Sequence, residues 1–445
     1  MVSQVKRLKN DIFGWPFVGF LFKNKKALFI VRAFVMALFI SAIYFGITYP
    51  MLEENPYTTA LFWSFFMIVS LVLLGPAFCG ICPHGVMGRF INKRGLKKSM
   101  PKWMQKRAIG LGILLFAYWV PVYLFPEFLK SPYISALLFM VLTLFAMLSY
   151  YIFKDMAYCT YLCPIGAVTK GYGKIGMAEL RTYQEECATC KTFDCAVACS
   201  SRLQPFLFEK KNSMRDCTLC MDCASACEAV SFEFTAPGAT LSKNINDKST
   251  AHTWVFILLL AVITMTMKFH HGLGHSALKT SLPWYKMGKW MESFMPSGVD
   301  WVGFSALVMA LGVTFLLVFG GFFVGSKILQ VEYKKYLHSL SYALIPLMII
   351  GSLSHIGTFF FVSYASSLTN AFYWLIGSDI TVKPLASFRD GWVHIFALLN
   401  FVAIIWSEIL VYKRVSLFTS SLKLKILATF WSSLIIYFLL FLAIL

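Results

Sequence analysis

The sequence predicts a mainly α, polytopic helical membrane protein with a small α+β domain inserted between its helices. Hydrophobic residues make up 58% of the 445 residues and charged residues only 14%, whereas soluble chains carry roughly a quarter charged residues. A helix needs about 20 apolar residues to cross a bilayer, and about nine runs approach that length. These runs are 27–49, 59–77, 108–126, 133–153, 253–269, 301–325, 336–358, 391–412 and 425–445.

Basic residues between the apolar runs predict the orientation of the chain. Residues 1–26 carry six basic side chains against one acid, and residues 78–107 carry eight basic side chains and no acid. The first short connection instead carries Glu53 and Glu54. Because basic residues concentrate in short cytoplasmic connections, we expect the N-terminus and residues 154–252 in the cytoplasm of a bacterium, with the helices in its inner membrane. This placement explains the net charge of +19 without nucleic acid as a partner.

The apolar runs and the cysteines together predict four segments. A basic cytoplasmic N-terminus (1–26) precedes a four-helix membrane domain (27–175), a cytoplasmic cysteine-rich domain (176–250) and a five-helix membrane domain (251–445). All 12 cysteines lie between positions 79 and 227. Disulfide frameworks are typical of small secreted domains, so these short spacings indicate metal ligands instead.

Eight of the cysteines form two runs with ferredoxin-like spacing. The first run, C-x2-C-x4-C-x3-C, comprises Cys187, Cys190, Cys195 and Cys199. The second, C-x2-C-x2-C-x3-C, comprises Cys217, Cys220, Cys223 and Cys227. In two-cluster ferredoxins the fourth cysteine of each run ligates the other cluster. One [4Fe-4S] cluster is therefore assigned to Cys187, Cys190, Cys195 and Cys227. The second is assigned to Cys217, Cys220, Cys223 and Cys199, and paired structural zinc sites are the alternative.

The other four cysteines occur in a short internal repeat. Cys79 and Cys82 follow one apolar run, Cys159 and Cys163 follow another, and each pair ends in Cys-Pro-X-Gly. The first four runs therefore resemble two duplicated helical hairpins. Three interpretations are open: the thiolates hold a further iron–sulfur or other metal centre at the membrane edge, they form redox-active dithiols near a quinone, or they are small apolar residues at a turn.

These motifs give the chain a resemblance to a known family. The ferredoxin runs, preceded by Cys79-x2-Cys82-Pro83 and Cys159-x3-Cys163-Pro164, resemble the NapH and NosR group of membrane polyferredoxins over about residues 25–235. The family motif is usually C-x3-C-P at both places, so the first pair is one residue shorter. The resemblance implies electron transfer between the quinone pool and other redox subunits or soluble redox proteins.

Seven of the eight histidines lie after residue 250, and the predicted topology sorts them by depth. His252 and His338 lie at cytoplasmic ends of apolar runs, and the other five lie near outer ends: His270, His271, His275, His355 and His394. A histidine pair at each side of the membrane is what a diheme b-type cytochrome requires. The candidate heme b ligands are His252, His338, His355 and His394. A quinone site involving His355 or His394, or histidines that only occupy the membrane interface, are the alternatives.

Two further polar residues are expected to have ordinary roles. Arg32 lies inside the first apolar run, where a long basic side chain can extend its charge to the membrane surface. His84 follows Cys82 and Pro83 in the first Cys-Pro motif. It is a candidate ligand or proton donor, and a surface position at a helix end is the simpler expectation.

Membrane-bound electron transfer is the function that these patterns favour. Electrons would pass between quinone and redox partners through two [4Fe-4S] clusters, with the chain as a quinol-dehydrogenase-type subunit of an oxidoreductase system. No catalytic residue is assigned. The second hypothesis is a ferredoxin-type reductant for metal-centre assembly or maturation, because CcoG-type polyferredoxins resemble the same core of helices and ferredoxin runs. Those proteins end in a soluble sandwich domain, where this sequence has apolar runs.

Overall fold

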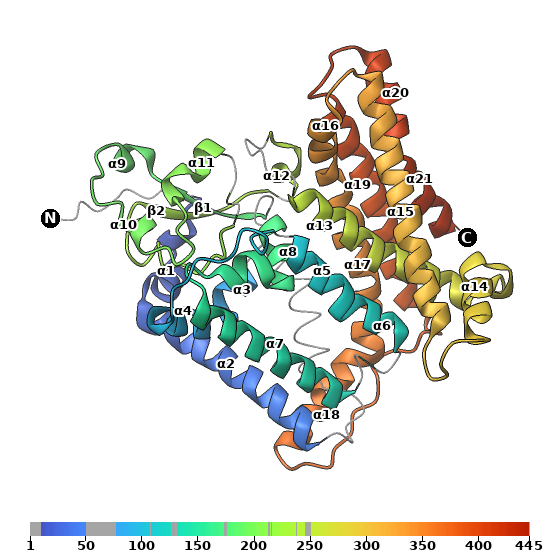
Figure 1. Cartoon of the computed structure of the whole chain (residues 1–445), viewed down its shortest axis with the longest axis horizontal. Helices are drawn as coiled ribbons and strands as arrows, with labels where there is room; N and C mark the ends of the chain where they lie inside the picture. Colours follow the sequence, from blue (N-terminus) through green and yellow to red (C-terminus); the bar gives the residue numbers. More distant parts are fainter. Residues whose placement is uncertain are drawn as a thin grey trace. The chain divides into compact units, whose positions relative to one another are not determined.

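Helices dominate the computed structural model of the chain (Figure 1). The structure describes residues 10–49, 77–106, 108–125, 128, 131–172, 176–211, 214, 216–236, 238–244 and 251–444. The chain divides into two compact units. The first comprises residues 1–58, 65–114 and 132–249, and the second comprises residues 59–64, 115–131 and 250–445.

Six helices in the described part of the chain are long and apolar enough to span a membrane. They are Lys25–Thr48, Pro132–Ile152, Thr253–His275, Trp301–Ile328, Tyr333–Asn370 and Gly391–Val415. Each corresponds to one of the predicted apolar runs. The chain is therefore a mainly α, multi-pass membrane protein, as predicted.

The remaining three predicted runs differ from simple spans. The run 425–445 corresponds to two helices, Leu422–Ser432 and Leu434–Ile444, that are bent by 55° relative to each other. The run 108–126 corresponds to a shorter apolar helix, Ala108–Leu124. All but the last residue of the run 59–77 lies outside the described residues.

The helices of the first unit bring the two Cys-Pro motifs into one body. Helices α2 (Lys25–Thr48) and α4 (Pro83–Arg94) both pack against α7 (Pro132–Ile152), as Figure 1 shows. Helix α4 and helix α8 (Pro164–Tyr172) each begin at the proline of a Cys-Pro motif. Proline suits this first position because the first N–H groups of a helix have no partner within the helix.

A glycine in α4 makes room for a tyrosine of α7. A Cβ atom at Gly88 would lie 2.5 Å from Cζ of Tyr150, closer than any side chain can approach. Any larger residue at position 88 would therefore displace Tyr150, which is buried in the cluster that also holds Ala157, Tyr158 and Leu162.

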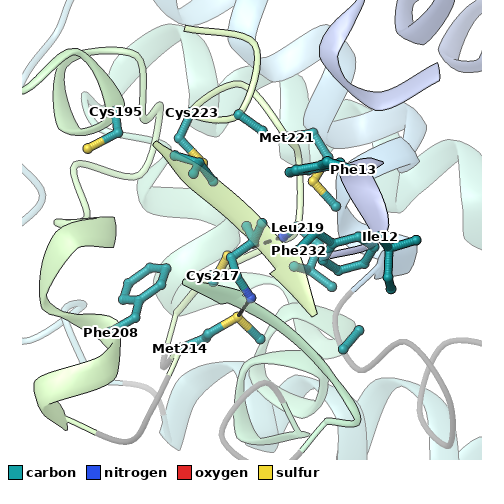
Figure 2. Packing of buried hydrophobic residues seen from close by; sticks show 14 of the residues in the cluster. Ile12, Phe13, Cys195, Phe208, Met214, Cys217, Leu219, Met221, Cys223 and Phe232 are labelled. Carbon is teal, nitrogen blue, oxygen red and sulfur yellow. Dashed lines mark hydrogen bonds between the residues drawn. The ribbon is translucent and has the colours of Figure 1, made fainter. Parts of the chain in front are cut away.

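A two-stranded antiparallel sheet organises the cysteine-rich segment. Strand β1 (Ala178–Thr182) pairs with β2 (Val230–Phe234), and Leu180 lies opposite Phe232. Figure 2 shows the buried residues that pack around these strands, with Cys195, Cys217 and Cys223 among them. The Leu180 N–H points at the sulfur of Met214, 2.8 Å away. The inserted α+β domain therefore has a small apolar core of its own.

The N-terminal segment belongs to this same core. Ile12 and Phe13 pack in it, and Phe13 lies beside Phe232 with ring centres 5.6 Å apart. Asp11 is 2% exposed and accepts hydrogen bonds from the Phe13 and Phe232 N–H groups and from the Tyr183 hydroxyl. Although the sequence predicts a separate basic segment over residues 1–26, its described part from residue 10 is thus built into the ferredoxin fold.

The second unit contains a helix with two π-helical turns. Helix α13 (Ala251–Leu259) continues into η6 (Leu260–Met265) and then η7 (Lys268–Gly272). Helices α15 (Trp301–Ile328) and α17 (Ile345–Phe359) pack against η6, and α17 also packs against α19 (Leu398–Val415). Because π turns widen a helix and often occur at functional sites, η7 and its histidines are of particular interest.

Candidate functional site

The four cysteines of the two Cys-Pro motifs converge in the first unit. We call Cys79, Cys82, Cys159 and Cys163 the membrane-edge tetrad. Cys159, Cys79 and Cys82 are near enough to Cys163 that their charges raise the pKa of its thiol. Cys159 likewise raises the pKa of Cys82. Four thiols from two separate hairpins therefore meet at one place. This convergence disfavours the interpretation in which each motif is only a local turn.

Polar groups surround the tetrad and reach its sulfur atoms. The Tyr150 hydroxyl lies 2.8 Å from Sγ of Cys159, and Oγ1 of Thr169 lies 2.9 Å from Sγ of Cys79. The Gly166 N–H donates to Sγ of Cys163 over 3.2 Å. Hydrogen bonds to ligand sulfurs are among the features that set the potential of iron–sulfur clusters. The surroundings are thus suited to a redox centre.

Two thiols of the tetrad, those of Cys82 and Cys163, hold their protons tightly when no metal is bound. Burial raises the pKa of Cys82 to about 11 and raises the pKa of Cys163 well above its usual range. Metal ligands must be deprotonated to bind. Assembly of a centre here therefore has to release protons into water or onto a base.

His84 lies within the protein rather than at its surface. Its Nε2 is 2.8 Å from Oγ1 of Thr143, and its ring meets those of Phe39 and Tyr158 edge-on. Burial lowers the pKa of His84 to about 4. The expectation of a surface position is wrong, because α4 turns this residue toward α2 and α7. A neutral imidazole bonded to Thr143 fits a packing role.

In the ferredoxin segment, the fourth cysteine of the second run lies with the first run. The Cys195 thiol donates a hydrogen bond to the sulfur of Cys227, which raises the pKa of Cys195 and lowers the pKa of Cys227. The nearby Cys187 also raises the pKa of Cys195. The Phe193 N–H donates to Sγ of Cys190 over 3.4 Å.

The fourth cysteine of the first run lies with the second run. Burial raises the pKa of Cys223, and the thiols of Cys217, Cys220 and Cys199 raise it further. Cys199 likewise raises the pKa values of both Cys217 and Cys220. Each fourth cysteine thus has cysteines of the other run as neighbours, as in two-cluster ferredoxins, and the assignment of the ligands to two clusters stays a prediction.

The loops around these cysteines turn sharply at residues other than glycine. Leu219 and Met221, which flank Cys220, have φ of 48° and 61°, and Phe193 has φ of 51°. Such left-handed positions point successive N–H groups into a shared concavity that favours anionic centres. The Leu219 N–H donates to Sγ of Cys217 over 3.4 Å, and the Leu203 N–H donates to Sγ of Cys199 over 3.3 Å. These donors suit the negative charge of a thiolate-bound cluster.

The two kinds of metal site that the sequence left open differ in geometry. A zinc ion binds four sulfurs at about 2.3 Å each, whereas each thiolate of a cubane binds a different iron and the ligands lie farther apart. Within the described residues, no three His, Cys, Asp or Glu side chains converge closely enough to hold one metal ion. Iron, sulfide and zinc analysis of the purified protein distinguishes the two.

Arg32 connects the membrane-edge tetrad to the ferredoxin segment. Its guanidinium donates to the carbonyl oxygens of Gly80, over 3.3 Å, and Cys220, over 2.6 Å, and it pairs with Asp222 at 3.2 Å. Gly80 lies between Cys79 and Cys82, and a Cβ there would be 2.5 Å from the carbonyl oxygen of Leu219. Groups of the two cysteine loops thus satisfy the charge of Arg32.

The candidate heme histidines lie on four different helices. His338 Nδ1 is 3.3 Å from Oγ1 of Thr253, and the backbone of His252 lies in α13. His394 is exposed in η12 (Gly391–Ala397). His355 lies in α17 next to His271, with ring centres 6.1 Å apart. The sequence predicts both His271 and His355 near outer ends of apolar runs, and the structure shows that their rings are neighbours.

Comparisons with known proteins agree with this chemistry. A family model described as a 4Fe-4S binding domain matches residues 55–101 and 135–179, the two stretches that contain the Cys-Pro motifs. Two uncharacterized proteins of Methanocaldococcus jannaschii are 28% and 25% identical to the chain. The first alignment covers 38% of this chain and 76% of the relative, and the second covers 53% and 97%.

Two further relatives have descriptive names. YccM of Escherichia coli, whose name assigns it provisionally to electron transport, is 28% identical over 44% of this chain and 60% of its own length. The regulatory protein NosR of Pseudomonas aeruginosa is 25% identical over 42% of this chain and 28% of its own length. No solved structure matches the chain. The resemblance to membrane iron–sulfur proteins of the NapH and NosR type is confirmed.

Proposed function

Because the chain is a multi-pass membrane protein homologous to iron–sulfur electron-transport proteins of the NapH and NosR type, we propose that it passes electrons between the quinone pool and a redox partner through three centres. Two are [4Fe-4S] clusters in the ferredoxin segment, with exchanged fourth ligands as assigned above. The third is an iron–sulfur centre held by the membrane-edge tetrad. In this role the chain serves as a quinol-dehydrogenase-type subunit.

The contact between the two cysteine loops is the observation that carries this proposal. The Leu219 carbonyl approaches Gly80 so closely that no side chain fits there, and Arg32 bonds to both loops. Cys223, which is assigned to the other cluster, also contributes to the raised pKa of Cys195, so the two cysteine groups are neighbours. An electron can therefore move in short steps from the tetrad to one cluster and then to the other.

The membrane setting supports quinone as the partner on one side. Cluster centres carry single electrons, and a lipid-soluble quinone is a carrier that a multi-pass protein meets within the bilayer. The basic connections of the first 107 residues support an inner-membrane topology with the ferredoxin segment in the cytoplasm. A soluble cytoplasmic redox protein or another subunit is then the partner on the other side.

Reduction of the clusters by quinol tests this function. The anaerobically purified protein, reconstituted in lipid, is mixed with a reduced short-chain quinone and examined by EPR. We expect reduced-cluster signals to grow with quinol concentration, because the tetrad accepts electrons at the membrane edge. Dithionite reduction of the same sample shows that the clusters are intact. If the clusters are intact but quinol does not reduce them, the result would contradict the proposal and favour the role in metal-centre assembly.

Substitution of Arg32 is expected to change the potential of the cluster held by Cys217, Cys220, Cys223 and Cys199. Arg32→Gln removes a positive charge beside the Cys220 loop, so the reduced, more negative cluster loses stabilisation. A unit charge several ångströms away is worth about 2–3 kcal/mol at an effective dielectric of 20, which lowers a one-electron potential by on the order of 100 mV.

Redox titration followed by EPR measures this shift. Arg32→Lys is the matched control, because it keeps the charge and loses the planar fork that reaches two carbonyl groups. A full downward shift in Arg32→Gln with a much smaller shift in Arg32→Lys supports a positioning role through charge. Equal potentials in all three proteins would show that Arg32 has only a structural role.

A further inference from the structure

A cavity of about 650 Å³ lies within the second unit, between the π turn η7, helix α17 and helix α19. Two of its sides are helix faces that carry histidine, and the third includes Asn400. The lining consists of Thr264, Met267, Lys268, His271, Gly272, His275, Gly351, Ser352, Ser354, His355, Thr358, Phe359, Phe388 and Asn400. The iron–sulfur chemistry described above involves none of these residues.

In this cavity the His271 ring has the separation that one heme iron requires both from His355 and from His275, at 6.1 and 6.3 Å between ring centres, and of these two only His355 lies on a different helix. His271, on η7, and His355, on α17, have ring centres 6.1 Å apart and planes inclined by 34°. Nitrogens bound at about 2 Å on opposite faces of one iron place their imidazole centres roughly 6 Å apart. The two ligands also come from different helices, so a flat macrocycle can enter between them.

The rest of the lining matches the chemistry of a porphyrin. Gly351, Ser352 and Gly272 are small residues that let a flat ring approach the helix backbones. Met267, Phe359 and Phe388 supply apolar contacts, and the Phe359 ring lies 4.1 Å from that of His355.

Lys268 supplies the charge that such a ligand needs. It lines the cavity together with His271, and the cavity lining contains no carboxylate. Basic residues inside membrane spans are costly and are normally paired. The propionate groups of a heme would supply the missing negative charge.

Two other occupants fit the cavity less well. A single metal ion held by His271, His275 and His355 does not match, because no three such ligands among the described residues converge closely enough. A quinone would use the polar groups but does not require two imidazoles at iron-binding separation. We infer that this cavity binds one b-type heme, with His271 and His355 as axial ligands and Lys268 beside a propionate. This site goes beyond the three centres of the proposed function.

Absorption spectroscopy of the full-length protein tests this inference. The protein is purified from cells supplied with a heme precursor, and heme is quantified by the pyridine hemochrome method. We expect about one heme per chain and the low-spin bands of two histidine ligands after dithionite reduction. We expect His271→Ala and His355→Ala each to lower the heme content at least tenfold. Absence of heme from the unsubstituted protein would overturn the inference.

Matched variants separate ligation from general damage. His394→Ala changes an exposed histidine outside the cavity lining and is expected to keep the heme. Loss of heme in His275→Ala with retention in His271→Ala would overturn the assigned pair. His355→Met keeps an axial donor, so a changed visible spectrum with retained heme identifies ligation directly. Helix content measured by circular dichroism shows whether each variant has folded, and it does not depend on the outcome of the heme assay.

Discussion

Cys199→Ser is expected to abolish the cluster held by Cys217, Cys220 and Cys223 while the other ferredoxin cluster persists. Serine provides a poor ligand, so one cubane loses a corner thiolate and the chain loses roughly four irons. The exchange of fourth ligands makes this result specific, because Cys199 belongs by sequence to the first run. Iron and acid-labile sulfide per chain, together with EPR of the reduced protein, measure the loss.

Double variants determine which cysteines share a cluster. Substitutions within one cluster should not add, whereas substitutions in different clusters should add. With exchanged ligands, Cys199→Ser combined with Cys217→Ser loses no more iron than either single variant. Cys199→Ser combined with Cys187→Ser loses both clusters, roughly eight irons. If the Cys199→Ser, Cys217→Ser variant loses both clusters and the Cys199→Ser, Cys187→Ser variant loses only one, each run holds its own cluster. Thr218→Ala, in the same loop as Cys217, serves as the control.

The ferredoxin cysteines can be assigned as candidate ligands from the sequence because their geometry is local. A two-residue gap between cysteines forces a tight loop, and such a loop presents successive thiols to the same side whatever the rest of the chain does. The exchange of fourth ligands followed from the ferredoxin pattern, and the proximity of Cys195 to Cys227 agrees with it. The membrane helices could be predicted from the apolar runs for a similar reason, since the thickness of the bilayer sets the length that such a run needs.

Contacts between distant segments could not be predicted from the sequence. Arg32 and Cys220 are separated by 188 positions, and no pattern in either segment points to the other. Arg32 therefore looked like an ordinary basic residue in a membrane helix. The packing of Ile12 and Phe13 into the ferredoxin core has the same origin. His355 was linked to His394 by depth alone, whereas the packing of η7 and α17 places it beside His271.

The membrane-edge tetrad depends both on a local sequence pattern and on a contact between distant segments. The repeat of Cys-Pro-X-Gly suggested that two hairpins are related, but only the fold determines whether their thiols meet. Gly166 and Gly85, which end the two motifs, each lie against the carbonyl oxygen of the first cysteine in their own pair. The backbone is thus alike at both motifs although the first pair is one residue shorter. This likeness supports a single centre with a pair of ligands from each hairpin.

Cys159→Ser is expected to remove this third centre and to stop quinol from reducing the ferredoxin clusters. If the tetrad holds a cubane, the iron content falls from about twelve to about eight per chain. The two ferredoxin clusters should still be reducible by dithionite, because none of their ligands is changed. Iron analysis and EPR before and after quinol addition measure both effects in the same sample.

The control for this variant has to preserve the packing around the tetrad. Tyr161→Phe changes a neighbouring residue in the same helical turn and keeps all four thiols, so it should retain the full iron content. A dithiol without iron would instead give unchanged iron in Cys159→Ser together with slower reduction by quinol. If iron content and quinol reduction both stayed unchanged, the thiols would be packing residues at a turn. The three interpretations that the sequence left open therefore give three different results in one pair of measurements.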